Sequence, residues 1–275
     1  MFTPAEITNN YITVAKNKTT MSWYKILILA VLAGAFIAFG GALATGASVG
    51  IEGTTGKLIK GAVFPLGLIL VVVCGAELFT GNCLLVAPAI NRDIKVKGLF
   101  KNLGLAYVGN LVGGVLIALL VVFSHVISLE AVAAAADAKA ALGFGDVLLR
   151  GILCNMLVCL AVWAAMASKS TVGKIIALYL PVFAFVVLGF EHSVADMYYL
   201  SAGLMTGEMT ANFGSCVLCL LAATIGNVIG GALIAIAYNA VYGKIKKKAL
   251  QKTEVVEDAG EPTSAAATDD ESAAK

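Results

Sequence analysis

His192 is one of only two histidines in the 275-residue chain, and it stands beside Glu191 inside an apolar run that covers residues 175–204. An imidazole, whose ordinary pKa is about 6.5, accepts and donates protons near neutral pH. Ionisable side chains are costly at membrane depth, and where they occur they line a water-filled path or pair with one another. This pair therefore predicts proton exchange or anion binding inside a membrane.

Polar residues around His192 interrupt the apolar run. Gly189, Ser193 and Asp196 occupy its centre, so the run is a poor candidate for one continuous lipid-facing helix. It is better interpreted as two half-helices that meet at a polar break, which is where transporters place their binding sites. We predict that Ser193 caps the second half-helix and that Thr80 does the same in an earlier run. Two helix N-termini pointing inward would favour an anion.

The composition indicates a membrane protein, since 60% of the residues are hydrophobic and 13% are charged. Runs long enough to cross a bilayer, about 20 residues each, cover residues 26–48, 61–90, 103–127, 147–167, 175–204 and 214–242. We therefore predict an all-α membrane protein with six transmembrane helices in one domain, residues 25–248, in which helices 2 and 5 are broken. No lysine or arginine lies deep within these runs, so a strong fixed cationic binding site is not expected.

The placement of lysine and arginine predicts the orientation. One side of the membrane would collect the basic residues that precede the first span, those in the second and fourth loops and those after the last span: Lys16, Lys18, Lys25, Arg92, Lys95, Lys97, Lys101, Lys169, Lys174, Lys244, Lys246, Lys247 and Lys248. The other side holds Lys57, Lys60, Lys139 and Arg150. The positive-inside rule then places both termini in the cytoplasm and the protein in the plasma (inner) membrane. A net charge of +2 does not suggest nucleic acid as a partner.

The two ends of the chain differ from the centre. Thr3 and Glu6 match a capping box with Pro4 at the first helical position, so residues 1–24 are expected to form a cytoplasmic amphipathic helix. Residues 131–142 favour a short surface helix outside the membrane. The acidic, Ala/Ser-rich residues 249–275 predict a disordered cytoplasmic tail.

An internal repeat relates the two halves. Residues 109–118 match residues 226–235 at seven of ten positions. The broken segments 75–82 and 189–196 correspond as well, although there only a glycine and a glutamate are identical. Each half has three predicted crossings, an odd number, so the second half would be inverted relative to the first. Inverted repeats with one broken helix each place a binding site near the midplane.

Three motifs resemble those of the formate/nitrite transporter family: residues 77–82 (ELFTGN), 151–163 (GILCNMLVCLAVW) and 189–195 (GFEHSVA). The resemblance covers roughly residues 3–248. It implies a homopentamer of aquaporin-like protomers, each with its own pore for formate, nitrite or hydrosulfide.

The resemblance also implies roles for individual residues. The segment Leu78, Phe79 and Thr80 is similar to the family's mobile loop, with Thr80 facing His192. Hydrophobic constrictions would be formed by Phe64, Leu68, Leu78 and Phe185. Polar support near the loop would come from Asn155, Asn227 and Glu191, together with Asp196, which replaces the asparagine common in the family. From the residues themselves, Glu77 and Glu191 are expected to bind backbone groups freed by the breaks.

The sequence thus predicts a channel or transporter for small monovalent weak-acid anions across the lipid bilayer, with formate first, nitrite and hydrosulfide as alternatives, and proton coupling through His192. It is not expected to be an enzyme. A neutral-solute channel of aquaporin type is a remote alternative, disfavoured because neither break contains proline. An intramembrane serine hydrolase is another, based only on the match of residues 46–50 to Gly-x-Ser-x-Gly. The six cysteines lack partners at ligand spacing, so no metal or cofactor is expected.

Overall fold

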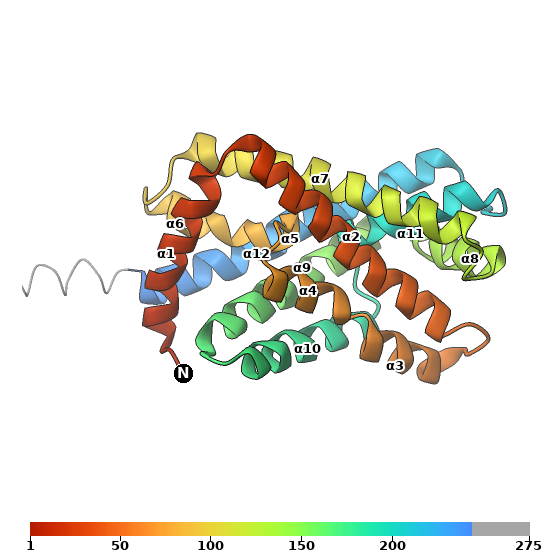
Figure 1. Ribbon diagram of the computed structural model, residues 1–275, viewed down its shortest axis with the longest axis horizontal. Coiled ribbons are helices and arrows are strands. Elements are labelled where there is room, and N and C mark those ends of the chain that lie inside the picture. Colours follow the sequence, from red (N-terminus) through yellow and green to blue (C-terminus); the bar gives the residue numbers. More distant parts are fainter. Residues whose placement is uncertain (244–275) are drawn as a thin grey trace, which may run out of the picture.

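The computed structural model describes residues 1–243, and within them the chain is helical without any β-strand (Figure 1). The helices follow one another through short loops. In chain order they are α1 (Pro4–Thr20), α2 (Trp23–Ala47), α3 (Gly53–Val63), α4 (Leu66–Cys74), α5 (Phe79–Asn82), the 3-10 helix η1 (Cys83–Leu85), α6 (Val86–Ile90), α7 (Val96–Phe123), α8 (Leu129–Ala140), α9 (Phe144–Ala167), α10 (Thr171–Val187), α11 (Ser193–Thr206) and α12 (Phe213–Tyr242).

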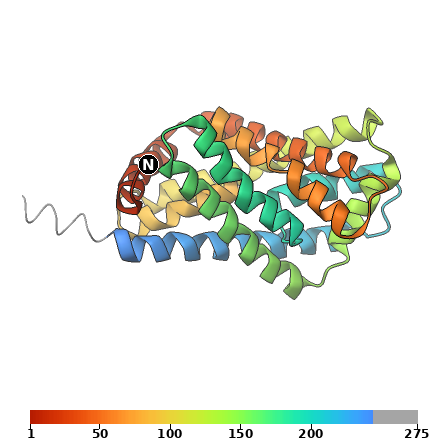
Figure 2. The same cartoon turned by 90° about the horizontal axis from the view of Figure 1, so that it is seen from below.

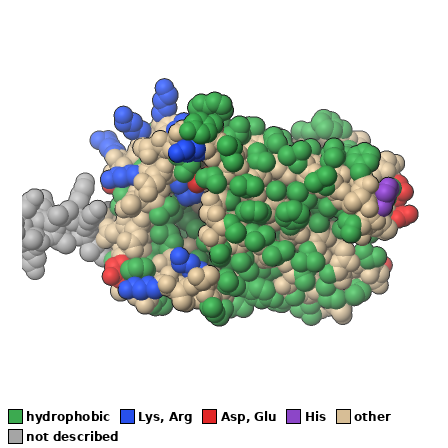
Figure 3. All heavy atoms as spheres, in the orientation of Figure 1, with side chains coloured by type: hydrophobic (Ala, Val, Ile, Leu, Met, Phe, Trp, Pro, Cys, Tyr) green, Lys and Arg blue, Asp and Glu red, His purple; other side chains and the backbone are tan. Residues whose placement is uncertain are grey.

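Within residues 1–243, five helical runs are long and apolar enough to cross a membrane, with mean hydropathies of 2.1 to 2.6. They are Trp23–Ala47, Gly53–Cys74, Val96–Phe123, Phe144–Ala167 and Phe213–Tyr242. Less than half of each apolar stretch is buried within the chain. Hydrophobic side chains consequently cover the middle of the molecule, and charged side chains gather towards its two ends (Figure 3). The predicted all-helical fold with several membrane-length helices is confirmed.

Two of the predicted spans are divided differently from the expectation. The run predicted over residues 61–90 begins earlier, because α3 and α4 form one membrane-length run that starts at Gly53. That run ends at Cys74, residues 75–78 are not helical, and α5 begins at Phe79. In the other half, α10 ends at Val187, and residues 188–192 separate it from α11. The polar interruptions therefore lie where the sequence placed them, but each is flanked by shorter apolar helices.

Glycines of the sequence repeat bring two pairs of helices into backbone contact. A Cβ at Gly113 would collide with the carbonyl of Val31, so α7 packs directly on α2. In the same way, a Cβ at Gly230 would collide with the carbonyl of Ile152, so α12 packs directly on α9. Small residues allow such close approach between membrane helices. The two pairs form equivalent frames on which the polar interruptions rest.

Helix α1 lies across one end of the bundle (Figure 2). The predicted capping box is confirmed, since the backbone N–H of Thr3 donates to Glu6 Oε2 over 2.7 Å and the Glu6 N–H donates to Thr3 Oγ1. These hydrogen bonds from Thr3 hold the pKa of the Glu6 carboxyl below its ordinary value. Ile7 and Tyr11 are buried against the protein, in a cluster that includes Trp163. The helix predicted at residues 131–142 is α8, whereas the predicted disordered tail, residues 249–275, lies outside the described residues.

Candidate functional site

The first interruption, residues 75–78, is held by one asparagine of α7. Asn110 Oδ1 accepts the backbone N–H of Phe79 over 2.9 Å, and its Nδ2 donates to the carbonyl of Glu77 over 3.0 Å and to that of Ala30 over 2.8 Å. Gly75 ends α4 with a left-handed φ of +80°. A single buried amide therefore supplies the hydrogen bonds that the interrupted helix cannot make for itself.

The second interruption, residues 188–192, repeats this pattern. Asn227 Oδ1 accepts the backbone N–H of Ser193 over 2.8 Å, and its Nδ2 donates to the carbonyls of Glu191 (3.0 Å) and Gly151 (2.8 Å). Gly189 takes the corresponding left-handed φ of +69°. Each asparagine thus binds the carbonyl of a glutamate and the N–H two residues later. Asn110, which sequence reasoning did not select, was detectable as the repeat partner of Asn227.

The expectation that Glu77 and Glu191 bind freed backbone groups is wrong, because the two asparagines fill that role. The predicted helix caps are also wrong. The residue that precedes α5 is Leu78, which makes no capping hydrogen bond, and Thr80 lies inside the helix. The cap of α11 is His192, and Ser193 is the first helical residue, with its hydroxyl unpartnered among the described residues.

His192 connects the two interruptions. Its Nδ1 accepts the backbone N–H of Ala195 over 3.1 Å, and its Nε2 lies 2.9 Å from Thr80 Oγ1. Because Nδ1 is an acceptor here, the neutral ring carries its proton on Nε2 and donates it to Thr80. The Thr80 hydroxyl hydrogen then remains available for another acceptor. His192 is 3% exposed and Thr80 is fully buried.

Apolar side chains enclose this pair. The ring of Phe185 stacks on the imidazole, with centroids 6.0 Å apart, and the ring of Phe64 meets Phe185 edge-on at 5.9 Å. Leu68 and Leu78 are each 2% exposed and belong to the same core cluster. Phe185 and Phe64 therefore lie beside the imidazole, and Leu68 and Leu78 belong to the same buried core.

Two cavities approach this enclosed centre. The first, about 490 Å³, is here called the Lys139 cavity; its lining includes Phe64, Phe185, Glu191 and His192 as well as Lys139. The second, about 320 Å³, is called the Lys18 cavity; its lining includes Leu68, Glu77, Leu78 and Asn82 as well as Lys18. The imidazole therefore faces one cavity and the Leu78 side chain faces the other.

Two other predicted site residues, Phe79 and Asn155, contact neighbouring helices. Phe79 is absent from the lining of both cavities, and its ring packs edge-on against Tyr107 of α7 at 5.0 Å. Asn155 Nδ2 donates to the carbonyl of Thr80 over 3.1 Å and to that of Asn227 over 2.6 Å. Asn155 consequently fixes α5 relative to α9 and α12.

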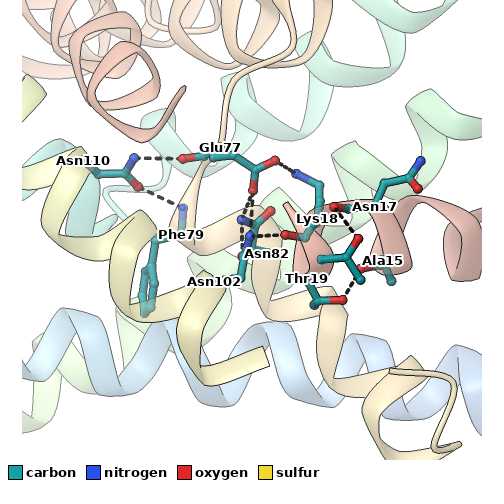
Figure 4. A network of polar contacts seen from close by, with 10 residues as sticks. Ala15, Asn17, Lys18, Thr19, Glu77, Phe79, Asn82, Asn102 and Asn110 are labelled. Carbon is teal, nitrogen blue, oxygen red and sulfur yellow. Dashed lines mark hydrogen bonds and ion pairs between the residues drawn. The ribbon is translucent and has the colours of Figure 1, made fainter. Parts of the chain in front are cut away.

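A partly buried ion pair lines the Lys18 cavity and belongs to a network of polar contacts (Figure 4). Lys18 Nζ, from α1, lies 2.7 Å from Glu77 Oε1. The other carboxylate oxygen accepts from Asn82 Nδ2 over 2.8 Å and from Asn102 Nδ2 over 3.1 Å. Since Asn102 also donates to the carbonyl of Lys18, the cluster connects α1, the first interruption and α7.

A second ion cluster borders the Lys139 cavity. Lys139 Nζ lies 2.6 Å from Glu191 Oε2 and 2.7 Å from Asp196 Oδ1, and 5.1 Å from the centre of the Tyr199 ring. Lysines that lie outside the predicted spans thus reach both interruptions, and each is paired with at least one carboxylate. Lys18 and Lys139 reach them from short helices 59 and 52 residues away in sequence, a distance that no local pattern bridges.

Asp137 holds α8 in the position that carries Lys139. Its carboxylate accepts the backbone N–H groups of Thr210 (3.0 Å) and Ala211 (2.8 Å). Partial desolvation raises the pKa of Asp137, but these hydrogen bonds outweigh it and hold the pKa below its ordinary value. The anchor is therefore charged at neutral pH.

The hydroxyl of Ser48, the serine of the hydrolase pattern, is hydrogen-bonded within its own helix. Ser48 Oγ donates to the carbonyl of Ala44 over 2.8 Å, and Ser48 ends α2 instead of following a strand. A Gly-x-Ser-x-Gly nucleophile requires a strand-to-helix turn that exposes the hydroxyl. The local structure provides neither feature.

The role of Asn110 leads to a stability prediction. Asn110→Leu should lower the unfolding free energy by about 2–5 kcal/mol, because three buried backbone groups lose their hydrogen-bond partner. Each unsatisfied group costs about 1–3 kcal/mol, and relaxation of the surrounding structure recovers part of the sum. Thermal unfolding in detergent measures this. Asn239→Leu is the matched control, since Asn239 makes only an exposed side-chain contact with Asn91 and should shift unfolding little. Equal shifts for both variants would contradict the role of Asn110.

The comparisons with known proteins agree with this geometry. The family model described as "Formate/nitrite transporter" matches residues 5–241. The chain belongs to the formate/nitrite transporter family. Among its relatives, this family member is 40% identical to the "Uncharacterized transporter YrhG" of Bacillus subtilis strain 168, covering 88% of this chain and 94% of that protein. It is 35% identical to the "Formate channel FocA" of Escherichia coli K12, covering 82% and 89%.

Solved structures support the same assignment. The "Pentameric formate channel with formate bound" superposes on this family member with a TM-score of 0.70 at 31% identity, covering 80% of this chain and 97% of that one. Members of this family are channels and transporters, so the chain belongs to the class of multi-pass membrane transporters.

Proposed function

We propose that this chain forms a channel for formate in which His192 exchanges protons with the anion. The observation that carries the proposal is the Thr80–His192 contact of 2.9 Å, enclosed by apolar side chains between two cavities. The names of the formate channels that it resembles support the choice of substrate.

The proposed mechanism follows from the cost of desolvation. A naked anion that passes Phe64, Leu68, Leu78 and Phe185 loses several kcal/mol of hydration, whereas the neutral acid loses far less. The Thr80 hydroxyl, which accepts from His192 Nε2, donates its own hydrogen to the arriving carboxylate. When the ring carries a second proton, transfer of one proton gives formic acid and neutral imidazole. The acid crosses the apolar part and releases its proton on the far side.

The direct test is formate uptake into proteoliposomes with simultaneous measurement of internal pH. Formate should enter together with protons and acidify the lumen in proportion, with nitrite and hydrosulfide as competing substrates and water flux as a separate measurement. Water flux without formate flux would favour a neutral-solute channel. If nitrite or hydrosulfide were transported in preference to formate, the proposed substrate would be wrong and the proposed anion pathway would still hold.

We further propose the finer architecture predicted from the sequence: six crossings as two inverted three-helix repeats with helices 2 and 5 broken, an aquaporin-like protomer, a homopentamer and cytoplasmic termini in the plasma membrane. The equivalent contacts of Asn110 and Asn227 support the repeat. Lysines that border a pocket between α1 and the start of α7 support the orientation (Figure 3); they are Lys16, Lys95, Lys97 and Lys101. The resemblance to a pentameric channel supports the oligomer.

Thiol labelling tests the proposed orientation. Ala134 on α8 and Lys16 on α1 are both exposed. An impermeant thiol reagent applied to intact cells should label Ala134→Cys and leave Lys16→Cys unlabelled, relative to the unsubstituted chain with its own exposed Cys74. The reverse pattern would place the termini outside.

A constriction formed by Leu78 predicts a gain of flux. Leu78→Ala should raise formate flux and weaken discrimination by size, up to about tenfold if the barrier falls by about 1.4 kcal/mol. The matched control is Leu84→Ala, because Leu84 is equally buried, at 1% exposure, and lines neither cavity. Both variants should be compared at equal amounts of assembled protein. Lower flux in assembled Leu78→Ala would identify Leu78 as a packing residue.

A further inference from the structure

Asp196 occupies an unusual position for a carboxylate. It lies in the first turn of α11, one turn after His192, and is fully buried. Its Oδ1 is 2.7 Å from Lys139 Nζ, but outside hydrogen-bonding geometry, and neither carboxylate oxygen accepts a hydrogen bond within the described residues. A buried carboxylate that is charged normally accepts several hydrogen bonds, and Asp196 accepts none.

The charges around Asp196 do not balance if every group is ionised. One ammonium, that of Lys139, faces two carboxylates, since Glu191 Oε2 is 2.6 Å from the same Nζ. With both carboxylates charged, the cluster would hold one uncompensated negative charge inside the protein, which is strongly unfavourable. A proton on one of the two carboxylates removes this charge.

Within the described residues no second cation contacts the two carboxylates, although Lys57, Lys60 and Arg150 also line the Lys139 cavity. Tyr199 of α11 contributes the face of its ring to Lys139. Cys219 of α12 donates its thiol to the Lys139 carbonyl over 3.5 Å, and Cys154 of α9 is a buried thiol. Arg150 of α9 points its guanidinium at the carbonyl of Gly189. His192 directs Nδ1 to Ala195 and Nε2 to Thr80.

Of the two carboxylates, Glu191 is the better charged partner. Its Oε2 accepts a hydrogen bond from Lys139, whereas Asp196 forms an ion contact without one. Glu191 also lines the Lys139 cavity, and Asp196 does not. The carboxylate with the donor and the access to water therefore keeps the charge, and the fully enclosed one keeps the proton.

We propose that Asp196 is a second proton-binding site of the pathway, which loads and releases its proton through the Lys139 cavity. The inference rests on the proposed function, because its consequence is for an anion in that cavity. With Asp196 protonated, Glu191 offsets Lys139 and the cluster is neutral. With Asp196 ionised, the cluster carries one negative charge and repels the anion. Anion entry therefore falls as the pH on this side rises.

The corresponding cluster at the first interruption lacks this property. There, Glu77 is the one carboxylate opposite Lys18, and Asn82 and Asn102 satisfy its second oxygen. One cation and one anion balance without an additional proton. The proton-dependent charge consequently belongs to the Lys139 side alone.

The transport test uses Asp196→Asn, which keeps the shape of the side chain and cannot ionise. Formate flux is measured in proteoliposomes with the pH varied only on the Lys139 side. At high pH, flux through the unmodified protein should fall by about tenfold more than flux through the variant. A unit charge roughly 10 Å from the anion produces a factor of about this size at an effective dielectric constant of about 20. Glu130→Gln is the matched control and should keep the steep profile, because Glu130 lies on the same helix, α8, and is exposed. If formate flux depended on pH in the same way in Asp196→Asn and in the unmodified protein, the proposal would be overturned.

A second measurement does not depend on transport. Infrared spectra of the unmodified protein, without formate, should contain the carbonyl stretch of a protonated carboxylic acid that disappears on titration to high pH. The band should be absent in Asp196→Asn and present in Glu130→Gln, which changes an exposed carboxylate of α8. Its absence from the unmodified protein, or its persistence in Asp196→Asn, would overturn the assignment to Asp196. The band without any formate flux would reject the proposed function and leave the proton site standing.

Discussion

Replacing His192 with phenylalanine is expected to reduce formate uptake by about 100-fold or more, because the Thr80 contact is lost and charge-assisted hydrogen bonds contribute about 1.5–3 kcal/mol each. The amide of Ala195 also loses its acceptor, since the imidazole Nδ1 is the cap of α11. Phenylalanine would extend the apolar enclosure of Phe185 and Phe64 across the centre. Uptake of labelled formate into proteoliposomes measures the change.

His192→Asn is the informative companion to this variant. Asparagine is among the best helix caps, so the Ala195 N–H keeps an acceptor and α11 should remain intact. The amide donates hydrogen bonds but does not exchange protons at neutral pH. Formate should then pass as a leak with weaker pH dependence and without proton coupling. A wild-type ratio of protons to formate in His192→Asn would show that His192 is not a proton relay.

Lys139→Met is expected to produce the second large effect. The substitution keeps a long side chain but leaves Glu191 and Asp196 buried without a cation, and removing one partner of a buried ion pair costs about 3–5 kcal/mol. Formate uptake at neutral pH should fall by about tenfold or more, because the cluster of Lys139, Glu191 and Asp196 changes from neutral to negative. Thermal unfolding in detergent and formate uptake at equal protein content measure the two effects.

The matched control is Lys57→Met. Lys57 lines the same cavity but is exposed and makes no ion pair among residues 1–243. Lys57→Met removes the same charge from an exposed site. It should therefore change formate flux modestly, in a salt-dependent way, and leave the unfolding free energy unchanged. The double variant Lys139→Met with Glu191→Gln should recover part of the lost stability, because it removes the carboxylate charge that Lys139 offsets. Equal losses in Lys57→Met and Lys139→Met would mean that the ion cluster has no special role.

The interruptions were predictable because local polarity produces them. Glycine, glutamate and histidine within an apolar run cannot form a lipid-facing helix, and the structure ends α4 and α10 at those positions. The repeat at residues 109–118 and 226–235 was equally visible, and its glycines explain the backbone contact of α7 with α2 and of α12 with α9. Features of this kind can be predicted from composition and sequence repeats.

The contacts that complete the site were not predictable from local patterns. Lys18 and Lys139 lie in segments that read as peripheral helices, and only the packing of α1 and α8 brings their ammonium groups to the interruptions. Helix caps were misassigned for a related reason. Thr80 and Ser193 are good caps by residue type, but the backbone N–H groups there are already taken by Asn110 and Asn227 or by the imidazole of His192.

The repeated hydrogen bonds also place Leu78 and His192 at equivalent positions, each immediately after the glutamate whose carbonyl an asparagine binds. The two halves thus share a frame but present different side chains, a leucine to the Lys18 cavity and an imidazole to the Lys139 cavity. An anion that arrives from the Lys139 side meets the proton donor before the leucine, and one that arrives from the other side meets them in the opposite order. Permeation should therefore rectify: at equal and opposite formate gradients, the flux that starts at the imidazole is expected to be the faster one.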